Sequence, residues 1–264
     1  MNVMQKFLLF SMSLILWNNV IDCKAKKDNT KNCAIKPNLS KTAKVTTDIP
    51  ASKKINTSDL IDEMYKNIKH QISDTERSMV TKTGGSPVYG EIKFDSLKKV
   101  LDDLNIKKTD VLYDLGSGTG KVLVQGYLDY PFKKVVGIEL SPTRNHHAET
   151  IRKNLEKKNL ITKDRKFELY NGDIAKENIS DATVIYMCST CYPEELMAKL
   201  TERFSKLKPG LTVITLKALP DNYEDFGLKH IKEYKLPMTW SEGSPVHIYK
   251  LEGKAKKAAK KAKK

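Results

Sequence analysis

The pattern of apolar and polar residues changes near residue 57. From there on, short apolar runs alternate with longer segments whose apolar residues recur at the spacing of an amphipathic helix. Strands are predicted over 111–114, 134–139, 166–170, 182–187, 211–217, 230–236 and 246–251. Helices are predicted over 57–82, 94–104, 142–158 and 193–207, with another beginning at Lys121. Strands that alternate with helices long enough to cross over indicate an α/β fold with a doubly wound, mostly parallel seven-stranded sheet.

The two ends of this alternation are distinctive. The helical pattern over 57–82 comes before the first strand and predicts an N-terminal helical extension, with Ser58 as a candidate N-cap. The glycine- and proline-containing stretch 84–87 separates this extension from the rest. The last two strands have no helix between them, so we expect them to form an antiparallel hairpin at one edge of the sheet.

The first 56 residues have a different composition. Phe7–Trp17 is an apolar run that resembles the core of a signal peptide and is too short to span a membrane comfortably. We therefore predict a hydrophobic, signal-like leader over 1–25, which is the only predicted contact with a membrane and favours entry into the secretory route or an organelle. An uncleaved helix or a start-site artefact is the alternative. Residues 26–56, rich in Lys, Asn and Thr, cannot build a core and are predicted to be a linker, with a transit peptide as the alternative.

The formal net charge of +15 is concentrated at the two ends. Residues 1–56 carry ten lysines and three acids, and 254–264 carry seven lysines and no acid, so the predicted domain over 57–253 is almost neutral. This distribution argues against a DNA-binding domain whose whole surface is basic. The Lys/Ala tail over 254–264 is suited to non-specific attraction to nucleic acid, and a solubilising tail is the alternative.

The cysteines and histidines argue against a disulfide scaffold and against a metal site. Four cysteines are too few for a disulfide scaffold in 264 residues. Cys188 and Cys191 form a C-x-x-C without a second ligand pair, and we interpret them as buried or pocket-lining residues. The five histidines show no metal-ligand spacing along the chain, so no metal site is predicted.

A glycine-rich turn follows the first strand of the predicted domain. In Asp114-Leu-Gly-Ser-Gly-Thr-Gly120 the glycines permit a tight turn, and the next helix offers unpaired N–H groups to a ligand. Asp114 comes before this turn, Glu139 ends the second strand and Asp173 follows the third. Acids at three successive strand ends suit the ammonium, sulfonium, ribose and adenine of S-adenosyl-L-methionine, whereas the pyrophosphate of NAD would be repelled.

These residues, with Lys208-Pro-Gly210, resemble a class I (Rossmann-like) methyltransferase. Val88-Tyr-Gly-Glu-Ile92 is similar to the loop that closes over the methionine end of the cofactor in the disruptor-of-telomeric-silencing type of lysine methyltransferase. The resemblance runs from about Met64 to Leu251. It implies that the cofactor is bound by Tyr89, Gly90, Glu91, Asp114, Gly116, Ser117, Gly118, Gly120, Lys121, Glu139, Asp173 and Ser189. Lys121 replaces a Gln that is usual in the nuclear members, and it could pair with the cofactor carboxylate.

The acceptor side departs further from the family. In the nuclear members an Asn-Asn-Phe run after the fourth strand lines the lysine channel, whereas here Cys188 and Ser189 replace the amides. Tyr192, Trp240 and Tyr249 are candidates for an aromatic acceptor channel, with core packing as the alternative.

The resemblance implies methyl transfer to a protein lysine, with a histone in chromatin as the usual substrate and the nucleus as the usual location. An RNA or small-molecule methyltransferase on the same fold is the alternative, although the chain lacks the Asn/Asp-Pro-Pro-Tyr run of many nucleic-acid enzymes. A non-enzymatic cofactor- or nucleic-acid-binding protein is a third reading, which the complete set of acids disfavours. The signal-like leader conflicts with a nuclear location.

Overall fold

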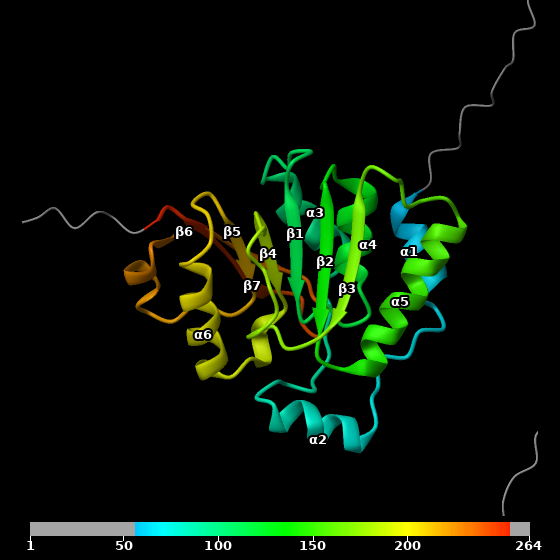
Figure 1. Ribbon diagram of the computed structural model, residues 1–264, viewed down its shortest axis with the longest axis horizontal. Helices are drawn as coiled ribbons and strands as arrows, with labels where there is room; N and C mark the ends of the chain where they lie inside the picture. Colours follow the sequence, from blue (N-terminus) through cyan, green and yellow to red (C-terminus); the bar gives the residue numbers. More distant parts are fainter. Residues whose placement is uncertain (1–55, 254–264) are drawn as a thin grey trace, which may run out of the picture. The chain divides into compact units, whose positions relative to one another are not determined.

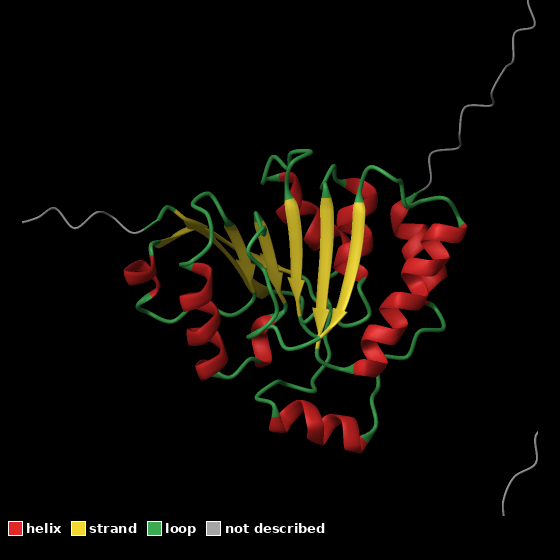
Figure 2. Cartoon of the chain, in the orientation of Figure 1, coloured by secondary structure: helices red, strands yellow, loops and turns green. Residues whose placement is uncertain are grey.

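A computed structural model describes residues 56–253 of the chain. The predicted leader over 1–25, nearly all of the linker over 26–56 and the tail over 254–264 lie outside the described residues. The described part folds into a seven-stranded sheet flanked by helices (Figures 1 and 2). The strands are β1 (Val111–Leu115), β2 (Lys134–Glu139), β3 (Lys166–Asn171), β4 (Val184–Met187), β5 (Thr212–Thr215), β6 (Leu228–Leu236) and β7 (Ser244–Leu251).

The strand order is β3-β2-β1-β4-β5-β7-β6. The first four neighbouring pairs are parallel, and β7 pairs antiparallel with both β5 and β6. The predicted doubly wound, mostly parallel sheet with an antiparallel hairpin at one edge is therefore confirmed, and it is the class I methyltransferase fold. The order reverses between β1 and β4, which opens a crevice at the carboxyl ends of these strands.

Each face of the sheet buries its own apolar cluster. The helices are α1 (Thr57–Tyr65), α2 (Asp74–Lys82), α3 (Phe94–Asp102), α4 (Lys121–Asp129), α5 (Pro142–Lys157) and α6 (Glu194–Phe204), with short 3-10 turns η1 (Ser189–Cys191) and η2 (Tyr223–Phe226). One cluster joins the sheet to α1, α3, α4 and α5, and the other joins it to α6. In Figure 1, α4 lies behind the sheet and α6 in front.

The N-terminal extension is present, but it contains two helices where the sequence pattern suggests one. Asn56, rather than Ser58, caps α1, because its side chain accepts a hydrogen bond from the backbone N–H of Ser58. The chain then leaves the helix, and Ser73 caps α2 by accepting from the N–H of Glu76. Figure 1 shows α2 beyond the arrowheads of β1 to β3, so the break carries α2 to the crevice.

Candidate active site

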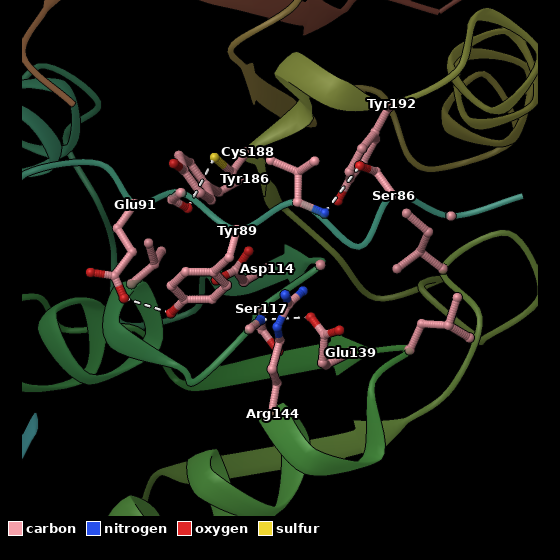
Figure 3. A pocket seen from close by; sticks show the side chains of 18 of the residues that line it. Ser86, Tyr89, Glu91, Asp114, Ser117, Glu139, Arg144, Tyr186, Cys188 and Tyr192 are labelled. Carbon is pink, nitrogen blue, oxygen red and sulfur yellow. Dashed lines mark hydrogen bonds between the residues drawn. The ribbon is translucent and has the colours of Figure 1, made fainter. Parts of the chain in front are cut away.

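A cavity of about 440 Å³ lies at the carboxyl ends of the parallel strands. It is bordered by the glycine turn after β1, by the ends of β2 and β4, and by the segment 83–94 between α2 and α3. Of the predicted site residues, those that line it are Tyr89, Gly90, Glu91, Asp114, Gly116, Ser117, Gly118, Lys121, Glu139, Asp173 and Tyr192. Figure 3 shows Tyr89, Asp114, Ser117 and Glu139 converging on this space.

The glycine turn is tied to the end of β2. Gly116 has a φ of 89°, a left-handed conformation in which an L side chain is strained, and its N–H donates to the carbonyl of Ile138 over 2.8 Å. Glu139 is 7% exposed and accepts the N–H of Gly118 at Oε2 over 2.8 Å and the N–H of Ser141 at Oε1 over 2.9 Å. Each carboxylate oxygen keeps a second lone pair. Glu139 is thus positioned to accept further hydrogen bonds from a ligand.

The floor of the cavity holds polar atoms without partners. Asp114 is 2% exposed, and among the described residues neither its Oδ1 nor the Oγ of Ser117 has a hydrogen-bond partner. Burial, and then the nearby Glu139, raise the pKa of Asp114 well above its ordinary value. Burial also raises the pKa of Glu139, against the hydrogen bonds and the Arg144 charge that lower it. Two buried carboxyl groups side by side favour a cationic ligand.

Asp173 completes the set of acids at the strand ends. It follows β3, and its Oδ1 accepts the N–H of Ala175 over 2.8 Å. Its other oxygen lies 3.1 Å from the Nζ of Lys176, whose side chain is largely exposed. The three acids predicted from the sequence therefore line one cavity.

The loop over residues 88–92, called the lid below, covers the glycine turn with the ring of Tyr89. The hydroxyl of Tyr89 donates to Glu91 Oε1 over 2.5 Å and lies 2.9 Å from the Oγ1 of Thr119 in the turn. The ring packs so closely on the turn that a Cβ at Gly118 would meet it at 2.7 Å. Lys121, at the start of α4, donates to Glu91 Oε2 over 2.6 Å. In this structure Lys121 therefore pairs with the lid.

Two side chains stack on the lid tyrosine. The ring of His70 lies parallel to that of Tyr89, with centroids 4.5 Å apart, and the guanidinium carbon of Arg144 lies 4.9 Å from the Tyr89 centroid. Arg144 also donates to the carbonyl of His70 over 3.1 Å and to that of Pro87 over 2.7 Å. Since Arg144 lies in the first turn of α5, it anchors both segments to the body of the domain.

Glu76 holds α2 against the start of α5. Its carboxylate accepts hydrogen bonds from the hydroxyl of Ser141, from the N–H of Thr143 over 3.0 Å and from the hydroxyl of Thr143 over 2.6 Å. These bonds lower the pKa of Glu76, although its partial burial opposes them. A carboxylate at a helix N-terminus is also favoured by the helix dipole. The N-terminal extension is thereby held beside the cavity.

The β6–β7 connection supports the lid from the other side. The N–H of Glu91 donates to the Oγ1 of Thr239 over 3.0 Å, and the N–H of Thr239 donates to the carbonyl of Glu91 over 2.9 Å. Ile92 and Met238 form an isolated antiparallel bridge. Trp240 packs against Gly90 so closely that a Cβ there would meet its ring at 2.4 Å. The lid therefore depends on residues nearly 150 positions later.

The three acceptor-channel candidates lie in different places. Tyr192 lines the cavity, and its hydroxyl donates to the carbonyl of Leu115 over 2.6 Å. Trp240 is 43% exposed and is not among the lining residues. Tyr249 is 3% exposed and packs edge-on against Tyr223 in the core, so the structure does not place it in a channel.

Two predicted cofactor residues do not line the cavity either. Ser189 is fully buried, and its hydroxyl bonds Thr215 over 2.6 Å and accepts the N–H of Lys217 over 3.0 Å, which is a structural arrangement. Gly120, with a φ of 88°, supports the turn as the N-cap of α4. Cys188, one position before Ser189, is a free thiol that lines the cavity as expected, whereas Cys191 is exposed and does not line it, so the expectation is wrong for Cys191.

The chain matches the family model described as histone methylation protein DOT1 over residues 69–238. This stretch covers well over half of the chain and includes the lid, the glycine turn and all three acids. The chain belongs to this family. The resemblance inferred from the glycine turn and the 88–92 loop is therefore confirmed.

Relatives from distant organisms share this part of the DOT1 family. A histone-lysine N-methyltransferase, H3 lysine-79 specific, of Drosophila melanogaster is 28% identical over 187 residues, which cover 61% of this chain and 10% of the fly protein. The Caenorhabditis elegans protein of the same description is 32% identical over 148 residues, covering 53% and 16%. A protein-lysine N-methyltransferase of Saccharolobus islandicus is 28% identical over 119 residues, covering 45% and 69%. The chain thus spans only a small part of its animal relatives.

Some residues of this site could not be identified from the sequence, because no motif marks them. Arg144 lies in α5 and His70 lies between α1 and α2; both act on the lid through packing, and neither belongs to a motif. Tyr186 lines the cavity from within β4. In the sequence it cannot be distinguished from the other apolar residues of a buried strand. By contrast, the break before α2 has a sequence signal that the prediction of one helix over 57–82 did not use. Ser73-Asp-Thr-Glu76 has the Ser-x-x-Glu form of a helix start.

Proposed function

We propose that this chain is an S-adenosyl-L-methionine-dependent protein-lysine methyltransferase whose substrate is a histone. The observation that supports this most directly is the cavity floor. Asp114 is buried, its Oδ1 has no partner among residues 56–253, and it lines the same cavity as Glu139 and Tyr89 in a chain of the DOT1 family. Three acids around one cavity suit a cofactor that carries an ammonium group, a sulfonium and a ribose.

The residues present fit this cofactor. The Oδ1 of Asp114 and the Oγ of Ser117 offer hydrogen-bonding capacity that no described residue uses. We assign Asp114 to the ammonium group, the free lone pairs of Glu139 to the ribose hydroxyls and Asp173 to the adenine amine. When bound, the cofactor supplies an electrophilic methyl group on sulfur. The chain has only to orient the acceptor amine in line with it and to exclude water.

The acceptor lysine must lose its proton before it can attack, since its pKa in water is about 10.4. A channel with few polar groups disfavours the ammonium form and lowers that pKa. Tyr186, Cys188 and Tyr192 line the β4 side of the cavity, and burial raises the pKa of Cys188 to about 12, so its thiol stays neutral. The lysine is therefore activated by desolvation, without a dedicated base.

The test is methyl transfer from labelled cofactor to nucleosomes, free histones, histones with every lysine replaced by arginine, and total RNA. We expect label on nucleosomes or free histones, and none on the lysine-free histones or the RNA. Asp221→Asn, an exposed acid outside the cavity, serves as the control for Asp114→Asn. Label that persists on lysine-free histones, or that goes only to RNA, would contradict the proposal.

The Lys/Ala tail at the C-terminus provides a second, separable function. Seven lysines in residues 254–264 can neutralise phosphates and hold the enzyme on nucleosomal DNA without reading its sequence. Deletion of 254–264 should lower activity on nucleosomes more than on free histones, and the difference should vanish at high salt. An equal loss on both substrates would assign the tail to solubility.

For location, the family favours the nucleus. None of the helices in residues 56–253 is long and apolar enough to cross a membrane. We propose that the protein acts in the nucleus on chromatin. A tag placed after residue 264, followed by imaging, tests this, because secretory or organellar signal would overturn it.

A further inference from the structure

The antiparallel hairpin at the sheet edge brings together three side chains that the sequence separates. His230 and Glu233 lie on β6, and His247 lies on β7. One ligand atom from each lies within 4.8 Å of those of the other two. We propose that His230, Glu233 and His247 bind a zinc ion that joins the two strands of the hairpin.

A β-bulge makes this cluster possible. Side chains alternate between faces along a strand, so residues 230 and 233 would normally point to opposite faces. The register slips between His230 and Lys232: His230 pairs with Tyr249, and Glu233 pairs with His247. Since residues 247 and 249 share a face, the extra residue turns His230 to the face of Glu233. The bulged residue, Ile231, is 53% exposed and has no core contact to explain it.

The geometry suits a tetrahedral zinc site. Two ligands at the usual zinc–nitrogen and zinc–oxygen distances of about 2.0–2.1 Å lie about 3.3 Å apart across a tetrahedral edge. The Nδ1 of His247 is 3.4 Å from a carboxylate oxygen of Glu233. The rings of His230 and His247 have centroids 5.6 Å apart, and a ring nitrogen of His230 lies within 4.8 Å of both other ligand atoms, so His230 supplies the third ligand. Water would take the fourth.

The ligand chemistry is consistent with this geometry. A zinc ligand must be a neutral imidazole or an ionised carboxylate. Two imidazoles and one carboxylate form a donor set that binds zinc in proteins, whereas magnesium and calcium prefer oxygen ligands only.

This site is separate from the cavity, since none of its three residues lines it. The strands that it would join lead directly into the 237–243 connection, which contacts the lid through Thr239. A zinc ion there would stabilise the hairpin and, through it, the loop that supports the lid. The proposed site therefore has a structural role.

The test is zinc titration of the full-length protein by calorimetry, with cobalt as a visible-absorption probe of tetrahedral geometry. We expect one zinc per chain, and at least tenfold weaker binding in His247→Ala and in Glu233→Gln. The chain has other possible ligands, so His146→Ala/His147→Ala and Cys188→Ser/Cys191→Ser serve as controls and should bind as the wild type does. Absence of stoichiometric binding, or equal binding by His247→Ala, would overturn the proposal.

Thermal unfolding with and without zinc gives a second readout that does not depend on activity. Zinc should raise the melting temperature of the wild type and of both control variants, and chelation should reverse the rise. The same zinc concentration should leave His247→Ala unchanged. If His247→Ala fails to fold, Glu233→Gln, which changes only an exposed carboxylate, keeps the test available. A zinc-dependent rise that persists in Glu233→Gln would count against the site.

Discussion

Asp114→Asn should stabilise the protein while it weakens cofactor binding. The carboxylate of Asp114 is buried, and its Oδ1 has no partner among the described residues. Leaving a neutral polar group buried and unpaired costs about 1–3 kcal/mol in the acid and in the amide alike, whereas an ionised group costs more, so the gain in the variant comes from the lost charge. Asparagine has nearly the same shape and no charge. The ligand-free variant should therefore gain about 1–3 kcal/mol at neutral pH, which raises the melting temperature of a domain this size by about 2–4 °C per kcal/mol.

The gain should depend on pH in a defined direction. In the unfolded chain Asp114 titrates near 3.9, whereas in the folded protein burial raises its pKa well above that value. Between these two values the folded protein keeps a proton that the unfolded chain releases, so the stability of the wild type falls as pH rises. Below about pH 4 both states are protonated, and the difference from Asp114→Asn should disappear.

The same change should weaken cofactor binding. A hydrogen bond between a carboxylate and an ammonium group contributes about 1.5–3 kcal/mol, which corresponds to roughly a 10- to 150-fold loss of affinity. The assays are urea unfolding from pH 3 to pH 8 and calorimetric titration with the cofactor, with Asp221→Asn as control. A variant less stable than the wild type at pH 7 would show that Asp114 makes a stabilising contact, and unchanged affinity would refute its assignment to the ligand.

One change in the lid and one in its ion-pair partner have distinct expected effects. Gly90→Ala places a Cβ 2.4 Å from the ring of Trp240, so the lid or the ring must move. We expect kcat/KM to fall between tenfold and a hundredfold. Gly243→Ala is the control, because a Cβ there meets open space and kcat/KM should not change. Lys121→Gln removes a partly buried ion pair with Glu91 worth up to about 1 kcal/mol, so KM for the cofactor should rise up to about fivefold with kcat preserved. Initial-rate kinetics check both; an equal fall of kcat in Lys121→Gln would show that Lys121 does more than hold the lid.

The sequence predicts most of the fold because its signals are local. The second strand occupies 134–139 as predicted, and the terminal hairpin follows from two apolar runs with no helix between them. The cofactor side is similarly accessible, because the glycine turn and the acids at successive strand ends meet at one edge in any parallel sheet.

What the sequence could not predict depends on packing between distant elements. Arg144 stacks on Tyr89 only because α5 and the lid meet in space. Tyr249 has the right residue type for a channel, but its place in the register turns it toward the core. His230 and His247 lie together only because of a bulge that no local sequence pattern indicates. From their spacing along the sequence, the two histidines are not expected to meet.

The attachment of the lid to the β6–β7 connection has a consequence for synthesis. The glycine turn and the lid itself are complete once residue 121 has left the ribosome, but Met238 and Thr239 contact the lid only after about 120 further residues have been made. Moreover, β7 lies between β5 and β6, so the connection is fixed only when the final strand inserts. A chain that lacks β7 therefore has the acids without the closed lid, and competence to hold the cofactor arises only after β7 has been made.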